Sequence, residues 1–273
     1  MKRIIYLALA GILLCGMISV FVSCNRGSNE GTLVCGVTIF PPMNFQDEAG
    51  NWTGFDTEFA QLVGAKLGME VEFQVIDWGR KFIELQAGTI GCIWNGMTAN
   101  VVDSVTGRPR YEDVDFSHAY MLNQQAVVIR IERAGEFLSH ADLIGKTVAV
   151  EAGSAGETIA RDAIGEDGQV IGTSAQIDTF IEVRSGAVDF GMVDILLAEQ
   201  MTNSGDHAAF LMIAPIEMSA EVYAIGFPKG SPLVARVNQA IRELFDSGDM
   251  QRLGRKYGLE SRIVLNTTRI EDM

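Results

Sequence analysis

Basic residues are scarce in this sequence, and they are not clustered. Its 273 residues include 21 Lys and Arg against 35 Asp and Glu, which gives a formal net charge of −14. No run of Lys or Arg interrupts this acidity, so the sequence argues against nucleic acid as a partner. Hydrophobic residues make up 48% of the chain, which is typical of a globular protein and excludes a largely disordered one.

Cysteine and histidine are also rare. The three histidines are scattered, and none lies in a hydrolase-type motif. No CxxC or Cys/His spacing is typical of a metal site, so we expect neither a metal nor another cofactor. Cys35 and Cys92 both lie in apolar, strand-like runs, where two buried thiols are favoured over a disulfide.

The N-terminus carries a long hydrophobic run. Two basic residues precede an apolar stretch at residues 4–22, as in an export signal. This stretch is close to the length of a membrane span, so an uncleaved anchor helix is one alternative and plain secretion is another.

The end of that stretch favours a lipoprotein. Phe21-Val-Ser-Cys24 resembles a bacterial lipoprotein signal, in which the Cys becomes the acylated N-terminus, although Leu is usual where Phe21 stands. We therefore expect a signal peptide at residues 1–23 and a lipid such as palmitate on Cys24. A polar, Gly-rich tether at residues 24–31 would follow. The protein would be exported and lipid-anchored to the cell membrane, facing the periplasm or the exterior.

From residue 32 onward, strand-like and helix-like segments alternate in two blocks. In the first block we expect strands at 33–38, 71–76 and 90–94, and helices at 55–67 and 78–87. In the second we expect strands at 126–130, 146–151, 170–172, 187–193 and 221–227, and helices at 153–163, 175–184, 194–201 and after a cap at Ser231. These orders indicate two α/β lobes with parallel strands. Open α/β sheets bind ligands beyond the carboxyl ends of their strands, so we expect a cleft between the lobes.

A series of short motifs follows the order found in a known family. They are GVTIFPPMNF at 36–45, GFD at 54–56, IDW at 76–78, GMT at 96–98, VDFS at 114–117, AY at 119–120, GKTVAVEAGS at 145–154, VDFGMVD at 188–194, YAIGFPKG at 223–230 and KYG at 256–258. With them the chain resembles the amino-acid-binding solute-binding proteins of bacterial ABC importers, which include the glutamine- and histidine-binding proteins. The resemblance covers nearly all of residues 32–259.

The resemblance implies a type II periplasmic-binding-protein fold, with two Rossmann-like α/β lobes joined by two hinge crossings. Lobe one would comprise residues 31–124 and 224–273, and lobe two residues 125–223. The crossings would lie at 124–129 and 220–225. The resemblance further implies a monomer.

A zwitterionic ligand needs a guanidinium for its carboxylate and a carboxylate for its ammonium. Arg110 precedes Asp115-Phe-Ser as the family's carboxylate-binding Arg does. A longer loop, roughly Asn100–Thr106, precedes it here and makes Arg108 a competitor. Asp194 matches the family's ammonium-binding Asp, and a helix N-cap is its structural alternative.

Further contacts are implied on both sides of the cleft. Thr98 matches a residue that bonds the ligand carboxylate, and Asn95 and Gly96 would offer backbone groups nearby. Ser154 begins the first helix of lobe two, where free N–H groups favour an anion.

Two aromatic residues, Phe40 and Trp78, match the pair that encloses the ligand side chain, although Trp78 would also fit a core position. Val37 stands where several relatives that bind cationic or amide side chains have Asp, which makes a cationic pocket of that type doubtful. Glu151 stands where others have Lys, Gln or Leu. Its carboxylate could bind a donor side chain or pair with a neighbouring Lys.

These features predict a binding protein without catalytic activity. Hinge closure would capture a small, polar amino acid, and the closed form would deliver it to an ABC permease and its ATPase. Two alternatives stay open: a dehydratase-type enzyme on the same fold, with Glu151 as general acid, and a host-contact or sensor lipoprotein.

Overall fold

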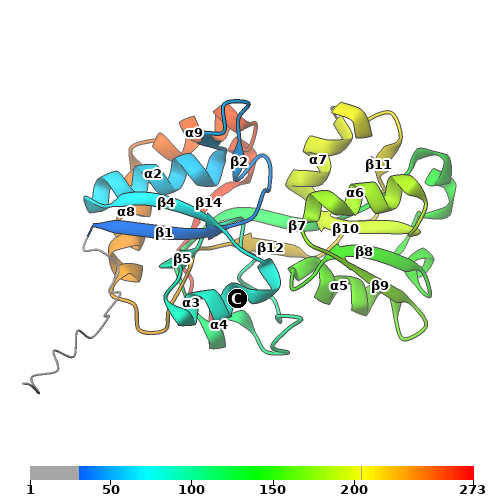
Figure 1. The fold of residues 1–273 in the computed structure, drawn as a ribbon, viewed down its shortest axis with the longest axis horizontal. Coiled ribbons are helices and arrows are strands. Elements are labelled where there is room, and N and C mark those ends of the chain that lie inside the picture. Colours follow the sequence, from blue (N-terminus) through cyan, green and yellow to red (C-terminus); the bar gives the residue numbers. More distant parts are fainter. Residues whose placement is uncertain (1–30, 204) are drawn as a thin grey trace, which may run out of the picture. The chain divides into compact units, whose positions relative to one another are not determined.

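A computed structural model describes residues 31–203 and 205–273, which form two α/β lobes (Figure 1). The predicted signal peptide, the lipidation site at Cys24 and residues 24–30 of the tether lie outside the described residues. Within residues 31–203 and 205–273, no helix combines the length and the apolar character needed to cross a membrane.

The first lobe is built on a five-stranded sheet in the order β4-β1-β5-β13-β6. Its strands are β1 (Thr32–Val37), β4 (Glu70–Val75), β5 (Cys92–Ile93), β6 (Asp115–Phe116) and β13 (Gly226–Phe227), and a separate small hairpin pairs β2 (Phe45–Gln46) with β3 (Trp52–Thr53). Its helices are α2 (Phe55–Leu67), α3 (Lys81–Ala87), α4 (Arg110–Asp113), α8 (Leu233–Asp246) and α9 (Asp249–Tyr257). Strands β4, β1 and β5 are parallel, so their carboxyl ends share one edge.

The second lobe is built on the sheet β11-β7-β10-β8-β9. Its strands are β7 (Ala119–Arg130), β8 (Thr147–Glu151), β9 (Gln169–Thr173), β10 (Phe190–Asp194) and β11 (Leu211–Ile213), and its helices are α5 (Ala155–Ile164), α6 (Gln176–Ser185) and α7 (Ile195–Asn203). Strands β10, β8 and β9 are parallel neighbours, and β7 runs antiparallel to β10 and β11.

Strand β7 belongs to both halves of the molecule. Its first part pairs with β12 (Ala220–Tyr223) and β14 (Ile263–Asn266), and its second part pairs with β10 and β11. Figure 1 shows β7 and β12 running together between the two lobes. The type II fold with two crossings is therefore present.

Local sequence signals account for most of these elements. Helix α2 ends at Gly68, whose φ of 70° places it in the left-handed region that favours glycine. Its buried face includes Phe55, Phe59 and Val63, spaced four residues apart as an amphipathic helix requires. Cys35 and Cys92 are buried free thiols at paired positions of β1 and β5, as predicted.

Three predicted segments differ from the structure. The helix predicted at 78–87 begins as a 3-10 turn, Trp78–Arg80, capped by Asp77, before α3 starts. The strand predicted at 221–227 is two strands, β12 and β13, which pair in different sheets. Ser231 accepts a hydrogen bond from Leu233 N at 3.3 Å, but Pro232 occupies the N-cap of α8.

Candidate functional site

The carboxyl ends of the parallel strands in both lobes border one small pocket. Glu151 ends β8 and Asp194 ends β10, so these two carboxylates lie at the ends of neighbouring parallel strands. The full lining comprises Trp78, Asn95, Gly96, Thr98 and Arg110 from lobe one, and Glu151, Ser154, Ala155, Gln176 and Asp194 from lobe two. This placement follows the general rule for open α/β sheets.

The predicted site residues other than Phe40 all line this pocket, together with Ala155 and Gln176. Phe40 is buried behind it instead. A Cβ placed on Gly96 would lie 2.7 Å from Phe40 Cε1, so the ring packs directly against the Gly96 backbone. Trp78 lines the pocket and is also buried in a cluster with Phe82 and Ile76.

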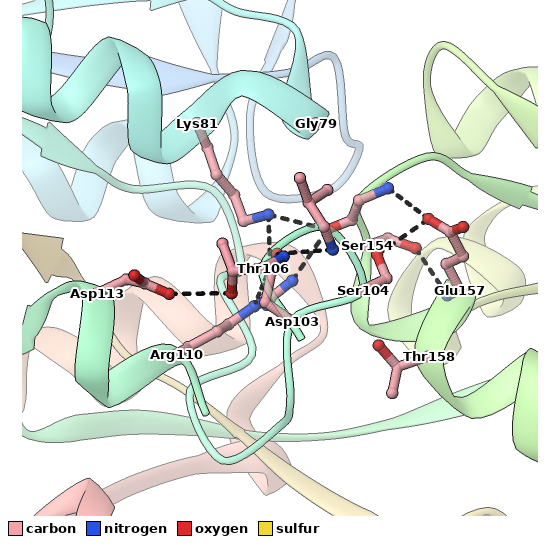
Figure 2. Close-up of polar contacts among 12 residues, drawn as sticks. Gly79, Lys81, Asp103, Ser104, Thr106, Arg110, Asp113, Ser154, Glu157 and Thr158 are labelled. Carbon is pink, nitrogen blue, oxygen red and sulfur yellow. Dashed lines mark hydrogen bonds and ion pairs between the residues drawn. The ribbon is translucent and has the colours of Figure 1, made fainter. Parts of the chain in front are cut away.

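Arg110 is buried, and three oxygen acceptors bind its guanidinium; Figure 2 shows it beside one of them, Asp103. Its Nε donates to Asp103 Oδ2 at 3.1 Å, and its Nη1 donates to the Thr98 carbonyl at 2.8 Å. Its Nη2 donates to the Gly153 carbonyl of lobe two at 3.1 Å. A guanidinium has five N–H donors, so two N–H groups remain for a ligand. The competitor Arg108 is half-exposed, ion-paired with Asp113 and not part of the pocket lining.

Sequence reasoning missed two charged residues beside Arg110. Lys81 at the start of α3 is fully buried, and its Nζ lies 2.7 Å from Asp103 Oδ2 and 2.9 Å from the Gly153 carbonyl oxygen. Burial and the charge of Arg110 lower the pKa of Lys81 to about 8. Burial alone would raise the pKa of Asp103, but the charges of Arg110 and Lys81 hold it below its usual value. Asp103 therefore serves as the shared counter-ion of both cations.

The loop that carries Asp103 also contacts the second lobe directly (Figure 2). Ser104 Oγ donates to Glu157 Oε2 at 3.0 Å, and Thr158 Oγ1 donates to the Val102 carbonyl at 2.8 Å. Glu157 also accepts a hydrogen bond from Gly153 N at 2.7 Å. The lengthened loop noted in the sequence thus lies against the N-terminus of α5.

Asp194 lies in a cluster of amide donors. Its Oδ1 accepts from Gln125 Nε2 at 2.9 Å and from Asn123, and its Oδ2 accepts from Gln176. The Gln176 side chain in turn accepts from Asp194 N at 2.9 Å. Burial raises the pKa of Asp194, and the amide donors oppose that rise.

A further buried carboxylate, Glu221, lies beside this cluster at the start of β12. It accepts from Thr98 Oγ1 at 3.1 Å, Asn123 Nδ2 at 2.6 Å and Gln125 Nε2 at 3.0 Å. Burial, followed by the charge of Asp194, raises its pKa to about 7. The Thr98 hydroxyl is therefore engaged with Glu221.

Glu151 differs from these groups because its Oε1 has no hydrogen-bond partner among the described residues. The side chain is buried in the pocket wall. Burial and the charge of Asp194 raise the pKa of Glu151 to about 8, while Lys81 and Arg110 act in the opposite direction. A buried carboxyl oxygen without a partner is costly, so it marks a position where a donor would be stabilising.

The remaining predicted residues shape the pocket walls. The Asn95 side chain bonds to Thr38 and Asn44, and Gly96 N donates to the buried Asp56 Oδ2 at 2.6 Å. These polar groups are thus occupied within lobe one. Ser154 caps α5 by accepting from Glu157 N at 3.1 Å, so an electropositive helix N-terminus borders the pocket at Ala155.

Some of the missed residues had a detectable signal. Asn123 and Gln125 lie two positions apart in β7, which places both side chains on one face of the strand. Glu221 stands opposite Asn123 in the β12–β7 pair. Within the described parts of the chain, no group of three or more His, Cys, Asp or Glu residues could hold a metal ion.

Comparison with known proteins identifies the family. Residues 33–260 match the bacterial extracellular solute-binding proteins, family 3. The arginine-binding extracellular protein ArtP of Bacillus subtilis (strain 168) is 28% identical over 239 residues, which cover 86% of this chain and 90% of the relative. The L-cystine-binding protein TcyJ of Escherichia coli (strain K12) is 27% identical over 236 residues, which cover 85% of each. The structure of an ancestral arginine-binding protein bound to arginine matches with a TM-score of 0.72 at 32% identity, covering 83% of this chain and 98% of that one. The chain therefore belongs to family 3 of the bacterial extracellular solute-binding proteins.

Proposed function

We propose that this protein captures a free α-amino acid between its lobes and delivers it to an ABC permease. The observation that carries this proposal is the placement of Arg110 and Asp194, from opposite lobes, in the lining of one buried pocket. Arg110 would bind the ligand carboxylate together with the N-terminus of α5, and Asp194 would bind the ammonium. The similarity to arginine- and cystine-binding proteins supports an amino-acid ligand.

Hinge closure would follow from the same arrangement. A ligand favours the closed state only by as much as it contacts both lobes. Arg110 already bonds to the Gly153 carbonyl across the cleft, so a carboxylate bound at Arg110 would lie next to lobe two. In this proposal lobe one comprises residues 31–124 and 224–273, and lobe two comprises residues 125–223.

Calorimetric titration of the full-length protein in detergent tests the proposal. The protein would first be unfolded and refolded to remove any co-purified ligand, then titrated with the twenty amino acids. A one-to-one heat with one or a few of them is expected. If circular dichroism shows that the protein is folded but no amino acid produces heat, the proposal of amino-acid capture is wrong.

Export and lipid anchoring complete the proposed function. The signal at residues 1–23 would be cleaved and Cys24 acylated, which would keep the binding lobes near the permease. A Cys24→Ala variant should move from the membrane fraction to the soluble or secreted fraction. Mass spectrometry of the wild-type N-terminal peptide should show an acylated Cys24, and an unmodified peptide at this position would contradict the anchor.

One observation favours a second candidate, a dehydratase on the same fold. Burial and the charge of Asp194 raise the pKa of Glu151 to about 8, so it would hold its proton at neutral pH as a general acid must. Incubation with arogenate or prephenate would then release phenylalanine or phenylpyruvate. If the wild type releases product and Glu151→Gln does not, the enzyme is favoured. If the substrate stays unchanged, the dehydratase hypothesis is wrong.

A further inference from the structure

The pocket region contains more buried acidic groups than buried basic ones. Lys81 and Arg110 are the basic residues, and both are paired with Asp103, at 2.7 Å and 3.1 Å. Three other carboxylates are buried nearby, those of Glu151, Asp194 and Glu221. Within residues 31–203 and 205–273, none of these three has a Lys or Arg nitrogen within 4.0 Å.

The three carboxylates are not equally satisfied. Amide and hydroxyl donors bond to Asp194 and Glu221, whereas Glu151 Oε1 has no partner among the described residues. A neutral zwitterion would supply one carboxylate to Arg110 and one ammonium to Asp194. It would leave Glu151 Oε1 buried and unpaired among the described residues, which disfavours the ionised carboxylate.

The wall of the pocket suits a second positive group. Trp78 lines it, and its ring attracts cations, since Lys81 Nζ already lies 5.5 Å from the ring centroid. Glu151 is the last residue of β8 and Asp194 the last residue of the neighbouring strand β10. A ligand whose ammonium binds Asp194 would therefore lie near Glu151. A guanidinium is also the group that a buried carboxylate binds most specifically.

We propose that the ligand is a basic amino acid, and that Glu151 binds the ammonium or guanidinium at the end of its side chain. This inference rests on the proposed function, because it assigns Arg110 and Asp194 to the two ends of the backbone zwitterion. It differs from the sequence expectation that Val37, in place of Asp, makes a cationic pocket doubtful. The carboxylate comes instead from lobe two, on the opposite wall.

Binding of such a ligand would release a proton. The charged groups that act on Glu151 are Asp194, Lys81 and Arg110, and its pKa in the structure is raised to about 8. A bound cation favours the ionised carboxylate, so it lowers that pKa and displaces the proton. Affinity for a basic amino acid should therefore rise from pH 6 to about pH 8 and level off above it.

Arginine and citrulline provide the test, because they differ in one positive charge and little in shape. The full-length protein in detergent is titrated calorimetrically with each, as wild type, Glu151→Gln and Glu166→Gln. Glu166 lies exposed in the turn after α5, so it is the matched control for the loss of one carboxylate. We expect Glu151→Gln to weaken arginine binding roughly 100-fold, as when one partner of a buried charge pair is lost. Citrulline binding should change by less than about threefold, and Glu166→Gln should resemble the wild type.

Two readouts separate this inference from the proposed function. If the wild type binds a neutral amino acid more tightly than arginine, and Glu151→Gln binds it equally well, the inference fails while amino-acid capture stands. If no amino acid binds, both fail. Titration of the wild type at pH 7 in two buffers of different ionisation enthalpy gives the number of protons released, without any variant. A larger proton release with arginine than with citrulline supports Glu151, and equal release overturns its role.

Discussion

The two ends of the pocket differ in how the protein compensates their charged groups. At the end of lobe one, Arg110 and Lys81 share the counter-ion Asp103, so the basic groups are neutralised and held by the protein itself. At the end of lobe two, Asp194 is held by amide groups, which donate hydrogen bonds but carry no charge. Its neighbour Glu151 has one oxygen, Oε1, for which the described part of the chain provides no hydrogen-bond partner.

This difference indicates where the ligand gains most. The basic end is positioned in advance, so binding a carboxylate there requires little rearrangement. In the described part of the chain the acidic end has no ion-paired Lys or Arg, so a bound cation would stabilise its ionised carboxylates, whereas a neutral group would not. Orientation would thus come from Arg110, and selectivity from Glu151 and Asp194.

Removing the basic end should have the largest effect on binding. We expect Arg110→Ala to weaken binding of the amino-acid ligand by about 3–5 kcal/mol, or about two to four decades in Kd, because the ligand carboxylate is left buried and unpaired. Arg108→Ala is the matched control, since Arg108 is half-exposed and paired with Asp113 outside the pocket. Calorimetry measures both, with circular dichroism to establish folding. Normal binding by Arg110→Ala alongside loss in Arg108→Ala would reverse the assignment.

Removing the shared counter-ion should mainly affect stability. Asp103→Asn leaves Lys81 and Arg110 buried with no carboxylate between them, so we expect the free energy of unfolding to fall by about 3–5 kcal/mol. Asp113→Asn, which affects a pair with the half-exposed Arg108, should cost about 1 kcal/mol or less. Urea denaturation gives both values. Equal losses would mean that Asp103 is no more important than Asp113, whose partner Arg108 is half-exposed.

The acidic end should make stability depend on pH. The pKa of Glu151 is raised to about 8 and that of Glu221 to about 7, so the folded protein holds protons that the unfolded chain has released. Stability should therefore be highest near pH 5 and decrease as pH rises toward 8. Each pKa unit corresponds to about 1.4 kcal/mol, so the two groups together would account for up to about 6 kcal/mol between pH 5 and pH 8. Unfolding curves of Glu151→Gln should depend less on pH, and identical profiles would show that Glu151 is not the cause.

Much of the fold could be predicted because its signals are local. The apolar spacing and the Gly68 cap specify α2 within its own sequence, and the strand ends carry Glu151 and Asp194 to one edge. Strand β13 could not be separated from β12 in this way. The run from Glu221 to Phe227 is uniformly strand-like, and only its partners in different sheets divide it.

The site was predictable where the family motifs supply residues, and not where distant segments meet. Lys81 stands in a helix like any solvent-exposed lysine, and its burial depends on Asp103, 22 positions further along the lengthened loop. No family motif covers that loop. The sequence therefore showed that the loop is long, but it did not show that Asp103 pairs with Lys81. The roles of Arg110, Asp194 and the other lining residues toward a ligand stay predictions.

The contact between the lengthened loop and α5 should have the smallest effect. Ser104→Ala removes the hydrogen bond to Glu157 Oε2, while Glu157 keeps its bonds to Gly153 N and Arg161. No buried charge loses its only partner, so we expect the affinity for the amino-acid ligand to change by less than about threefold, or roughly 0.5 kcal/mol. A tenfold or larger loss in calorimetry would show that the contact of Ser104 with lobe two contributes directly to ligand affinity.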